Sequence, residues 1–389
     1  MRPSFLWNLV GSLLPLLLVG AGAAVAQQPV ACTGLQAFWC GAVGPPDAGP
    51  LVVDAGAPAC SACTLNYRSF GRLESAPGRV ITPRSRVAID KYYRTFVVTE
   101  PGPRIAVYDD RGAFERFLPW QPSGPGRTVR DIEVVLGPRG AVHVREGNVA
   151  TMIEPAIRDW PEVRLPPGYG SFTATPADLY LAVPEPSAEE QRGSIAAVGR
   201  AGTNYTFGNV LARSAADCVV DCMELILADA YDFFKGGVFL AVSYRYELSV
   251  FDGWGLEETQ TVRFEGSPWL SSGRGADDAT ARTLPRGPRI VDLGYEGRGG
   301  RLWIIGRTAA ADPPAAGGAP ASRVADVWEI RRPPPGQRDV RIAAARLLVR
   351  ASVRDDMELL LPYFGITRER SPDDGVAIEL FEIFVSAPR

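Results

Sequence analysis

The chain has 389 residues, a formal net charge of −3 and 22% charged residues, so its composition is that of a folded, nearly neutral protein. Arginine supplies almost all of the positive charge, since Lys91 and Lys235 are the only lysines. The sequence has no basic block and no stripe of arginine and aromatic residues, so nucleic-acid binding is excluded as an expected function.

The first predicted element is a signal peptide over 1–26. An apolar run covers 9–26 and ends in Ala24-Val25-Ala26, which places small residues at −3 and −1 of a cut after Ala26. An uncleaved membrane anchor is the alternative, although glycine and proline within the run weaken a spanning helix. A lipoprotein signal fits less well, because Cys32 lies beyond a polar break. We therefore expect an extracytoplasmic protein, periplasmic or secreted, with no stable membrane span after cleavage.

All the cysteines follow the expected cut, and their even number in an exported chain predicts disulfides. Fifteen pairings are open, and local pairing is the simplest of them. Local pairing would join Cys32 to Cys40, Cys60 to Cys63 and Cys218 to Cys222. A redox pair or half of a zinc site are the alternatives for Cys60-x-x-Cys63. A zinc site would need another Cys or His pair at similar spacing, and Cys60 does not open a helix in a βαβ setting, as a thioredoxin-like pair would. Residues 27–63 are rich in Cys, Gly and Pro and are predicted to be irregular.

A repeated strand pattern dominates the remainder of the chain, 64–389. In each copy an aromatic residue or histidine stands between aliphatic residues, often just after a turn. The central residues of the copies are Phe96, His143, Tyr180, Phe239 and Trp303. An apolar strand precedes each copy, and others follow it, as at 105–108 and 248–251. The stretches at 215–230 and 343–353 are ambiguous between helix and strand.

Four antiparallel strands that repeat at intervals of about 40 to 60 residues are typical of propeller blades. We predict an all-β, six-bladed β-propeller with four-stranded antiparallel blades at 86–118, 129–165, 170–208, 222–265, 288–350 and 355–386. The last unit lacks a strand, which 65–73 could supply, so that an N-terminal strand closes the last blade. A set of β-sandwiches is the alternative, but it would not require a recurring turn followed by an aromatic residue. The Ala/Gly/Pro-rich stretch 309–322 is predicted to be a flexible surface loop.

Several of these units resemble a known family. The run from Arg104 to Gly112, followed by Ser123-Gly124-Pro125-Gly126, looks like the first blade of the six-bladed propellers that are common among exported bacterial proteins and distantly related to NHL-repeat propellers. The sequence Gly300-Arg301-Leu302-Trp303-Ile304 is similar to their inner strand, and Cys60-Ser61-Ala62-Cys63 is also familiar in that group. The resemblance covers about 64–386 and implies a fold without implying a reaction, because most members have no assigned chemistry.

No catalytic motif was found. His143 is the only histidine, and it occupies a position that is aromatic in the other copies, so a core role is the simpler interpretation. There is no Gly-x-Ser-x-Gly elbow and no phosphate-binding Gly-x-x-x-x-Gly-Lys.

Carboxylates are the remaining candidates for chemistry, because some propeller hydrolases and lactonases bind calcium through them. Those on or beside the predicted first strands are Asp131, Glu133, Asp229, Asp232, Asp292 and Glu296; the pairs Asp277-Asp278, Asp355-Asp356 and Asp373-Asp374 fall in loops. Solvated strand ends and surface loops are the simpler interpretation. We predict a ligand- or protein-binding module of unknown partner, without a cofactor. The alternative is a calcium-dependent hydrolase or lyase with its carboxylate site at the central channel.

Overall fold

The computed structural model describes residues 49–90, 92–136, 142–153, 162–165, 169–174, 179–184, 195–199, 204–207, 225–230, 237–242, 245–252, 258–270, 288–297, 299–308, 322–331, 341–361, 363–370 and 375–387. These all belong to one compact unit, 42–389. The expected signal peptide and most of the loop 309–322 lie outside the described residues. So do the cysteines at 32, 40, 218 and 222.

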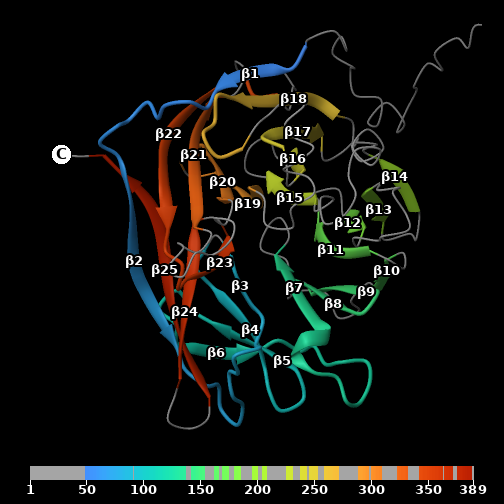
Figure 1. Ribbon diagram of the computed structural model, residues 1–389. Helices are drawn as coiled ribbons and strands as arrows, with labels where there is room; N and C mark the ends of the chain where they lie inside the picture. The colour runs from blue at the N-terminus through green and yellow to red at the C-terminus, as the bar shows by residue number, and fades with distance from the viewer. Residues whose placement is uncertain are drawn as a thin grey trace, which may run out of the picture. The chain divides into compact units, whose positions relative to one another are not determined.

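Antiparallel sheets make up the described part of the chain (Figure 1). Five of them are four-stranded, as expected for propeller blades. The first contains β3 (Val87–Ile89), β4 (Thr95–Thr99), β5 (Arg104–Tyr108) and β6 (Phe114–Phe117). The second contains β7 (Ile132–Leu136), β8 (Val142–Glu146), β9 (Val149–Ile153) and β10 (Glu162–Arg164), preceded by the 3₁₀ turn η2 (Val129–Asp131). The third contains β11 (Tyr169–Ala174), β12 (Leu179–Pro184), β13 (Ile195–Gly199) and β14 (Asn204–Phe207).

The other two four-stranded sheets lie toward the C-terminus. One contains β19 (Arg289–Glu296), β20 (Arg301–Arg307), β21 (Arg323–Arg331) and β22 (Ala344–Val353). The other contains β23 (Glu358–Leu361), β24 (Phe364–Arg370), β25 (Val376–Ser386) and β2 (Thr64–Leu73). The ambiguous stretch at 343–353 is therefore a strand, and 225–230 is also a strand.

The remaining sheet differs from the expected architecture because it has five strands. It contains β15 (Leu225–Ala230), β16 (Gly237–Val242), β17 (Glu247–Asp252) and β18 (Glu258–Glu265), and β1 (Leu51–Asp54) is added to its outer edge, parallel to β18. The prediction of six four-stranded blades is thus correct for five sheets and wrong for this one. The prediction that 27–63 is irregular is wrong at β1, where alternate exposed and buried residues let Val53 join the core while Val52 stays exposed.

The first strands of successive sheets contact one another in chain order, β3 to β7, β11, β15, β19 and β23, and β23 contacts β3. Such a closed series is the arrangement of a β-propeller. The expected closing strand is confirmed, since β2 pairs antiparallel with β25 from Thr64 opposite Ser386 to Leu73 opposite Ile378. The last blade therefore combines β2, from near residue 70, with three strands from 358–386.

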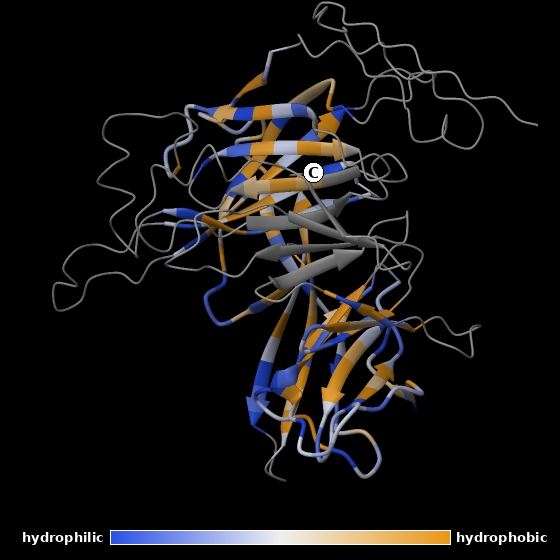
Figure 2. Cartoon of the chain, turned by 90° about the vertical axis from the view of Figure 1, so that its right-hand side faces the viewer, coloured by the Kyte–Doolittle hydropathy of each residue, from blue (hydrophilic) through white to orange (hydrophobic). Residues whose placement is uncertain are grey.

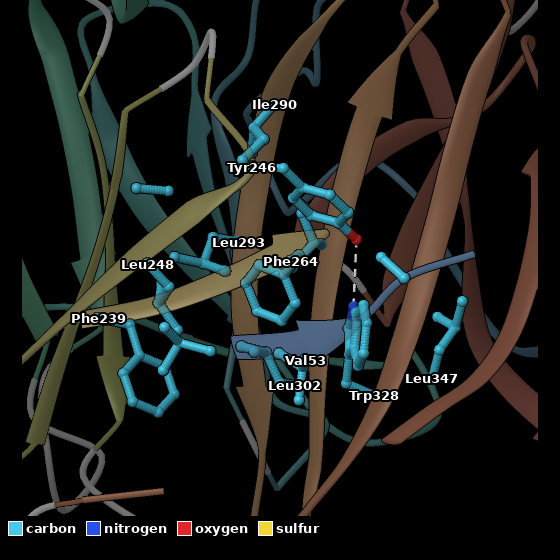
Figure 3. Close-up of a cluster of buried hydrophobic side chains, with 14 of the residues drawn as sticks. Val53, Phe239, Tyr246, Leu248, Phe264, Ile290, Leu293, Leu302, Trp328 and Leu347 are labelled. Atoms are coloured by element: carbon cyan, nitrogen blue, oxygen red, sulfur yellow. Dashed lines mark hydrogen bonds between the residues drawn. The ribbon is translucent and has the colours of Figure 1, made fainter. Parts of the chain in front are cut away.

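Side chains packed between neighbouring sheets form the core. The strands β4 and β20 are almost entirely buried, and Phe96, Phe239 and Trp303 are each 1% exposed or less, which confirms that these repeated aromatic positions are core positions. In Figure 3 side chains of β1, the sheet of β15–β18 and the sheet of β19–β22 meet in one cluster, which includes Val53, Phe264 and Trp328. Figure 2 shows hydrophobic and hydrophilic residues interspersed along many of the strands, as expected where strands have differently exposed faces.

The predicted pairing of Cys60 with Cys63 is confirmed, with 5.3 Å between the two Cα atoms. No helix among the described residues is long and apolar enough to cross a membrane.

Candidate functional site

The carboxylates near the start of β7 have local structural partners. Asp131 accepts hydrogen bonds from the backbone N–H and hydroxyl of Thr128, at 2.8 and 3.0 Å, and these bonds lower the pKa of Asp131. Glu133 forms an ion pair with Arg145 on β8, 2.8 Å from the guanidinium. Burial raises the pKa of Glu133, and the charges of Arg145 and Arg86 partly offset that effect.

The two carboxylates of β19, Asp292 and Glu296, have different hydrogen-bond partners. Asp292 accepts a hydrogen bond from the backbone N–H of Leu293 at 2.8 Å, and burial raises the pKa of Asp292 to about 7. Glu296 accepts a hydrogen bond from the indole N–H of Trp303 at 3.0 Å and lies 3.9 Å from the guanidinium of Arg301. These contacts tie Glu296 to the next strand of its own sheet.

In the part of the chain that the structure describes, no three His, Cys, Asp or Glu side chains come together in a group that could hold a metal ion. Asp356 forms an ion pair with Arg354, at 2.6 Å. The side chain of Asp229 is not described, and Asp232, Asp277-Asp278 and Asp373-Asp374 lie outside the described residues. The described carboxylates therefore do not assemble the calcium site that the alternative function would need.

His143 is 4% exposed, in the middle of β8. It faces Val135 and Met152 in the register of the two neighbouring strands. The interpretation of this histidine as a core residue is confirmed.

The turn between β3 and β4 is unusually constrained. Asp90 is 4% exposed, and its Oδ1 atom accepts hydrogen bonds from the backbone N–H groups of Tyr92 and Arg94, at 2.8 and 2.9 Å. Its Oδ2 atom accepts from Nε of Arg94 at 2.8 Å and lies 2.7 Å from Nη2. One buried carboxylate thus fixes both the backbone of the turn and the side chain of Arg94.

Tyr93 takes a left-handed backbone conformation in this turn, with φ of 68°. This conformation is uncommon for any residue other than glycine and is a true outlier for a bulky one. Such backbone strain persists only where the surroundings overdetermine it, and it concentrates at functional sites.

The surroundings of Tyr93 come from the last blade, which β2 completes. The Tyr93 ring lies edge-on to Phe70 of β2 and Phe364 of β24, with 5.1 Å between ring centres in each case. Its hydroxyl donates a hydrogen bond to Glu382 of β25 at 2.6 Å. The turn from the first blade is therefore locked against the last one.

The aromatic contacts continue into the preceding sheet. Tyr363 lies 5.1 Å from Phe364 and 6.3 Å from Trp303 of β20, measured between ring centres. The series from Trp303 to Tyr93 therefore joins three successive sheets. Tyr363 and Tyr93 lie between the first and second strands of their sheets, and Trp303 lies within the second strand of its sheet.

Tyr92 is presented to solvent by this arrangement. It is 57% exposed, one of three large hydrophobic residues that are exposed in the described chain, and Arg94 stands 5.9 Å from its ring centre. Tyrosine and arginine are enriched where proteins make energetically important contacts, since each combines a large contact area with hydrogen bonding. We define residues 90 and 92–94 as the tyrosine turn and take them as the candidate binding site.

The tyrosine turn was not among the predicted sites. A signal was present, because the stretch 90–94 between two strands contains no glycine that could take a left-handed conformation without strain. Asp90 at the start and Arg94 at the end are the residues that compensate for this.

No protein-family model and no curated protein matches the chain. The expected resemblance to NHL-repeat propellers therefore stays a prediction.

Several solved structures resemble the chain at low sequence identity. A member of the DUF4221 family from Bacteroides vulgatus is 10% identical, with 84% of this chain and 99% of that chain covered and a TM-score of 0.48. A putative exported protein from Bacteroides fragilis is 8% identical, with 87% and 99% covered and a TM-score of 0.46. The Cps50 (Swd1) β-propeller domain of Myceliophteria thermophila is 12% identical, with 82% and 99% covered and a TM-score of 0.41. Likenesses at this level carry no weight, so the propeller assignment depends on the strand pairing described above.

Proposed function

We propose that this protein is an exported binding module that contacts its ligand or protein partner through the tyrosine turn. Its place of action would be the periplasm or the extracellular space, because the sequence begins with a pattern typical of cleaved signal peptides. The disulfide between Cys60 and Cys63 supports an oxidising compartment.

The observation that carries the proposal is the exposure of Tyr92 on a turn that is held rigid from both sides. Asp90 fixes the turn from within, and the contacts of Tyr93 with Phe364 and Glu382 fix it from the last blade. A side chain that is ordered before binding loses less conformational entropy on binding, so Tyr92 is suited to act as an anchor.

We further propose that the five-stranded sheet is one blade of the same ring as the five four-stranded sheets, which would give six blades. The contacts of β15 with β11 on one side and β19 on the other support this. The strand β1 would then be an addition to a blade that is otherwise like the others.

A binding comparison tests the proposed function. The full chain and the Tyr92→Ala variant are immobilised and exposed to an envelope extract of the source organism, and the retained molecules are quantified by mass spectrometry. Val80→Ala is the matched control, because Val80 is another exposed apolar residue, at 37%.

We expect at least one molecule to be retained equally by the native chain and Val80→Ala. Its binding to Tyr92→Ala should be weaker by about 30-fold, the effect of an anchor residue worth roughly 2 kcal/mol. Equal retention by all three proteins, with unchanged circular dichroism spectra, would show that the tyrosine turn is not the contact surface.

A further inference from the structure

Residues 51–63, which we call the strap, run along the outer strands of two successive sheets, β18 and β22, and lead into the outer strand of a third. The strap begins as β1 on β18, and the backbone N–H of Ala55 donates to the carbonyl of Glu265 at 2.6 Å. The N–H groups of Ala59 and Cys60 then donate to the carbonyls of Leu347 and Leu348 on β22, at 2.8 and 3.3 Å. After Cys63 the chain enters β2, on the edge of the third sheet.

The edge of β22 is shaped to receive the strap. Consecutive carbonyl groups of a regular strand point to opposite edges, so Leu347 and Leu348 would not normally both accept from one neighbour. A bulge solves this problem, because Val327 and Trp328 of β21 pair with Val349 and Leu347 and leave Leu348 as the extra residue.

The two ends of the strap are held by different means. At the β1 end Val53 and Ala55 are buried, at 8% and 0% exposure, and Arg350 donates to the carbonyls of Ala55 and Gly56 at 2.9 and 3.1 Å. At the other end, the exposed or half-buried residues 56–62 have no buried side chain among them. Two backbone hydrogen bonds to β22 and the packing of half-buried Cys63 against the core cluster that includes Trp303 hold this end. The disulfide adds a further constraint, because it closes the short turn from Cys60 to Cys63.

We propose that the Cys60–Cys63 disulfide is a redox-operated catch that keeps the second half of the strap, residues 57–63, on the edge of β22. Both cysteines are half-buried, so a small dithiol can reach the bond. One thiolate of the dithiol attacks a cysteine sulfur and breaks the S–S bond, and its second thiol then displaces the mixed disulfide. The dithiol is oxidised to a disulfide, and Cys60 and Cys63 take up two electrons and two protons as thiols.

Reduction frees the turn, and its added conformational freedom favours release of residues 57–63 from β22. The β1 end stays in place through Val53 and Arg350, and the ring stays closed because β2 keeps its long pairing with β25. The reduced protein therefore exposes the carbonyls of Leu347 and Leu348 on an open sheet edge, which is the kind of edge that pairs with another extended chain.

Hydrogen exchange of the full chain tests this proposal, with the Cys60→Ser/Cys63→Ser double variant beside the native protein. We expect the amides of residues 59 and 60 to exchange about tenfold faster in the double variant and in native protein treated with a dithiol, the size of effect expected for a short disulfide-closed loop. Amides of 65–73 in β2 should be unchanged. Dithiol added to the double variant should cause no further change at 57–63, which separates this disulfide from those that the other cysteines could form.

Unchanged exchange at residues 59 and 60 in the double variant would overturn the proposal. So would acceleration of equal size throughout β2, because the disulfide would then support the whole closing blade and not the strap.

Discussion

Arg350 faces Asp326 directly across the paired strands β22 and β21. Its Nε and Nη2 atoms donate to the two carboxylate oxygens, at 2.6 and 2.7 Å, and Asp326 is completely buried. The same carboxylate accepts hydrogen bonds from the hydroxyl of Tyr246 and, at 3.1 Å, from the indole N–H of Trp269. Burial and the neighbouring carboxylate raise the pKa of Tyr246 well above its usual value, so its hydroxyl remains a donor.

Replacement of Arg350 by alanine should destabilise the fold severely. The Asp326 carboxylate would lose its only ionic partner among the described residues while remaining buried, which typically costs about 3–5 kcal/mol. Urea denaturation of Arg350→Ala measures this loss. Arg346→Ala is the matched control on the same strand, because its ion pair with Glu329 is exposed on both sides and is worth about 0–1 kcal/mol. Similar losses in the two variants would contradict our account of Asp326.

Asp292 should make stability depend on pH in a direction opposite to that of a typical acid. Its pKa in the folded chain is about 7, above the value of about 3.9 for an unfolded aspartate, so the folded state holds the proton more tightly. The contribution of Asp292 to the free energy of unfolding is therefore fully present below about pH 4 and is lost as the pH rises through about 7. Asp292→Asn should remove this dependence and be more stable than the native chain at pH 8, by an amount on the order of 2 kcal/mol.

Urea denaturation of the two proteins at pH 5 and pH 8 measures the effect of Asp292. Asp110→Asn, in an exposed turn, is the control and should keep the native pH dependence. If Asp292→Asn shows the same pH dependence of stability as the native chain, the Asp292 carboxyl of the native chain is not protonated in the folded state.

Gly306 on β20 should tolerate no side chain. A Cβ atom at this position would overlap the ring of Trp269. Trp269 is itself buried and donates a hydrogen bond to Asp326, so it has little room to move. Gly306→Ala should therefore lower the free energy of unfolding by about 1–3 kcal/mol. Thermal unfolding detects the loss, and Gly124→Ala, with open space around it, has the same chemistry without the overlap. A native melting temperature for Gly306→Ala would mean that Trp269 can be displaced freely.

The hydroxyl of Tyr93, which is bonded to Glu382, should contribute more to stability than that of exposed Tyr92. Tyr93→Phe removes a hydrogen bond to Glu382 and should cost about 1 kcal/mol. Tyr92→Phe, one residue away on the same turn, should change the free energy of unfolding very little because this side chain is exposed. The two variants are compared by urea denaturation, and the reverse order of stabilities would refute the role given to Tyr93.

The sequence predicted the strands well because each blade is a local unit. The turn residues and the alternation of apolar positions lie within about 60 residues of one another, so the blades could be located. The closing strand β2 was predicted differently, from the strand that the last unit lacks. The Asp326 cluster could not be, since Tyr246 lies 80 residues and Trp269 57 residues from Asp326 in the chain. Contacts of this kind depend on how neighbouring sheets are placed, and no local pattern encodes them.

The carboxylates were a poor guide to the site for a related reason. Position on a first strand does not determine whether a side chain meets others like it, and Glu133, Asp292 and Glu296 each have a separate local partner. In the sequence, the tyrosine turn is marked only by the lack of glycine in 90–94. This lack is informative only when the flanking strands β3 and β4 are known.

The pairing of β2 with β25 has a consequence for biosynthesis. Thr64 and Ser386, which face each other at one end of this pairing, are 322 residues apart, so almost the whole chain must be made before the pairing can begin. Until then β2 is an unpaired strand with its backbone groups available to any neighbour. Chains that stop short of β25 would therefore keep an unpaired β2 and be prone to aggregate.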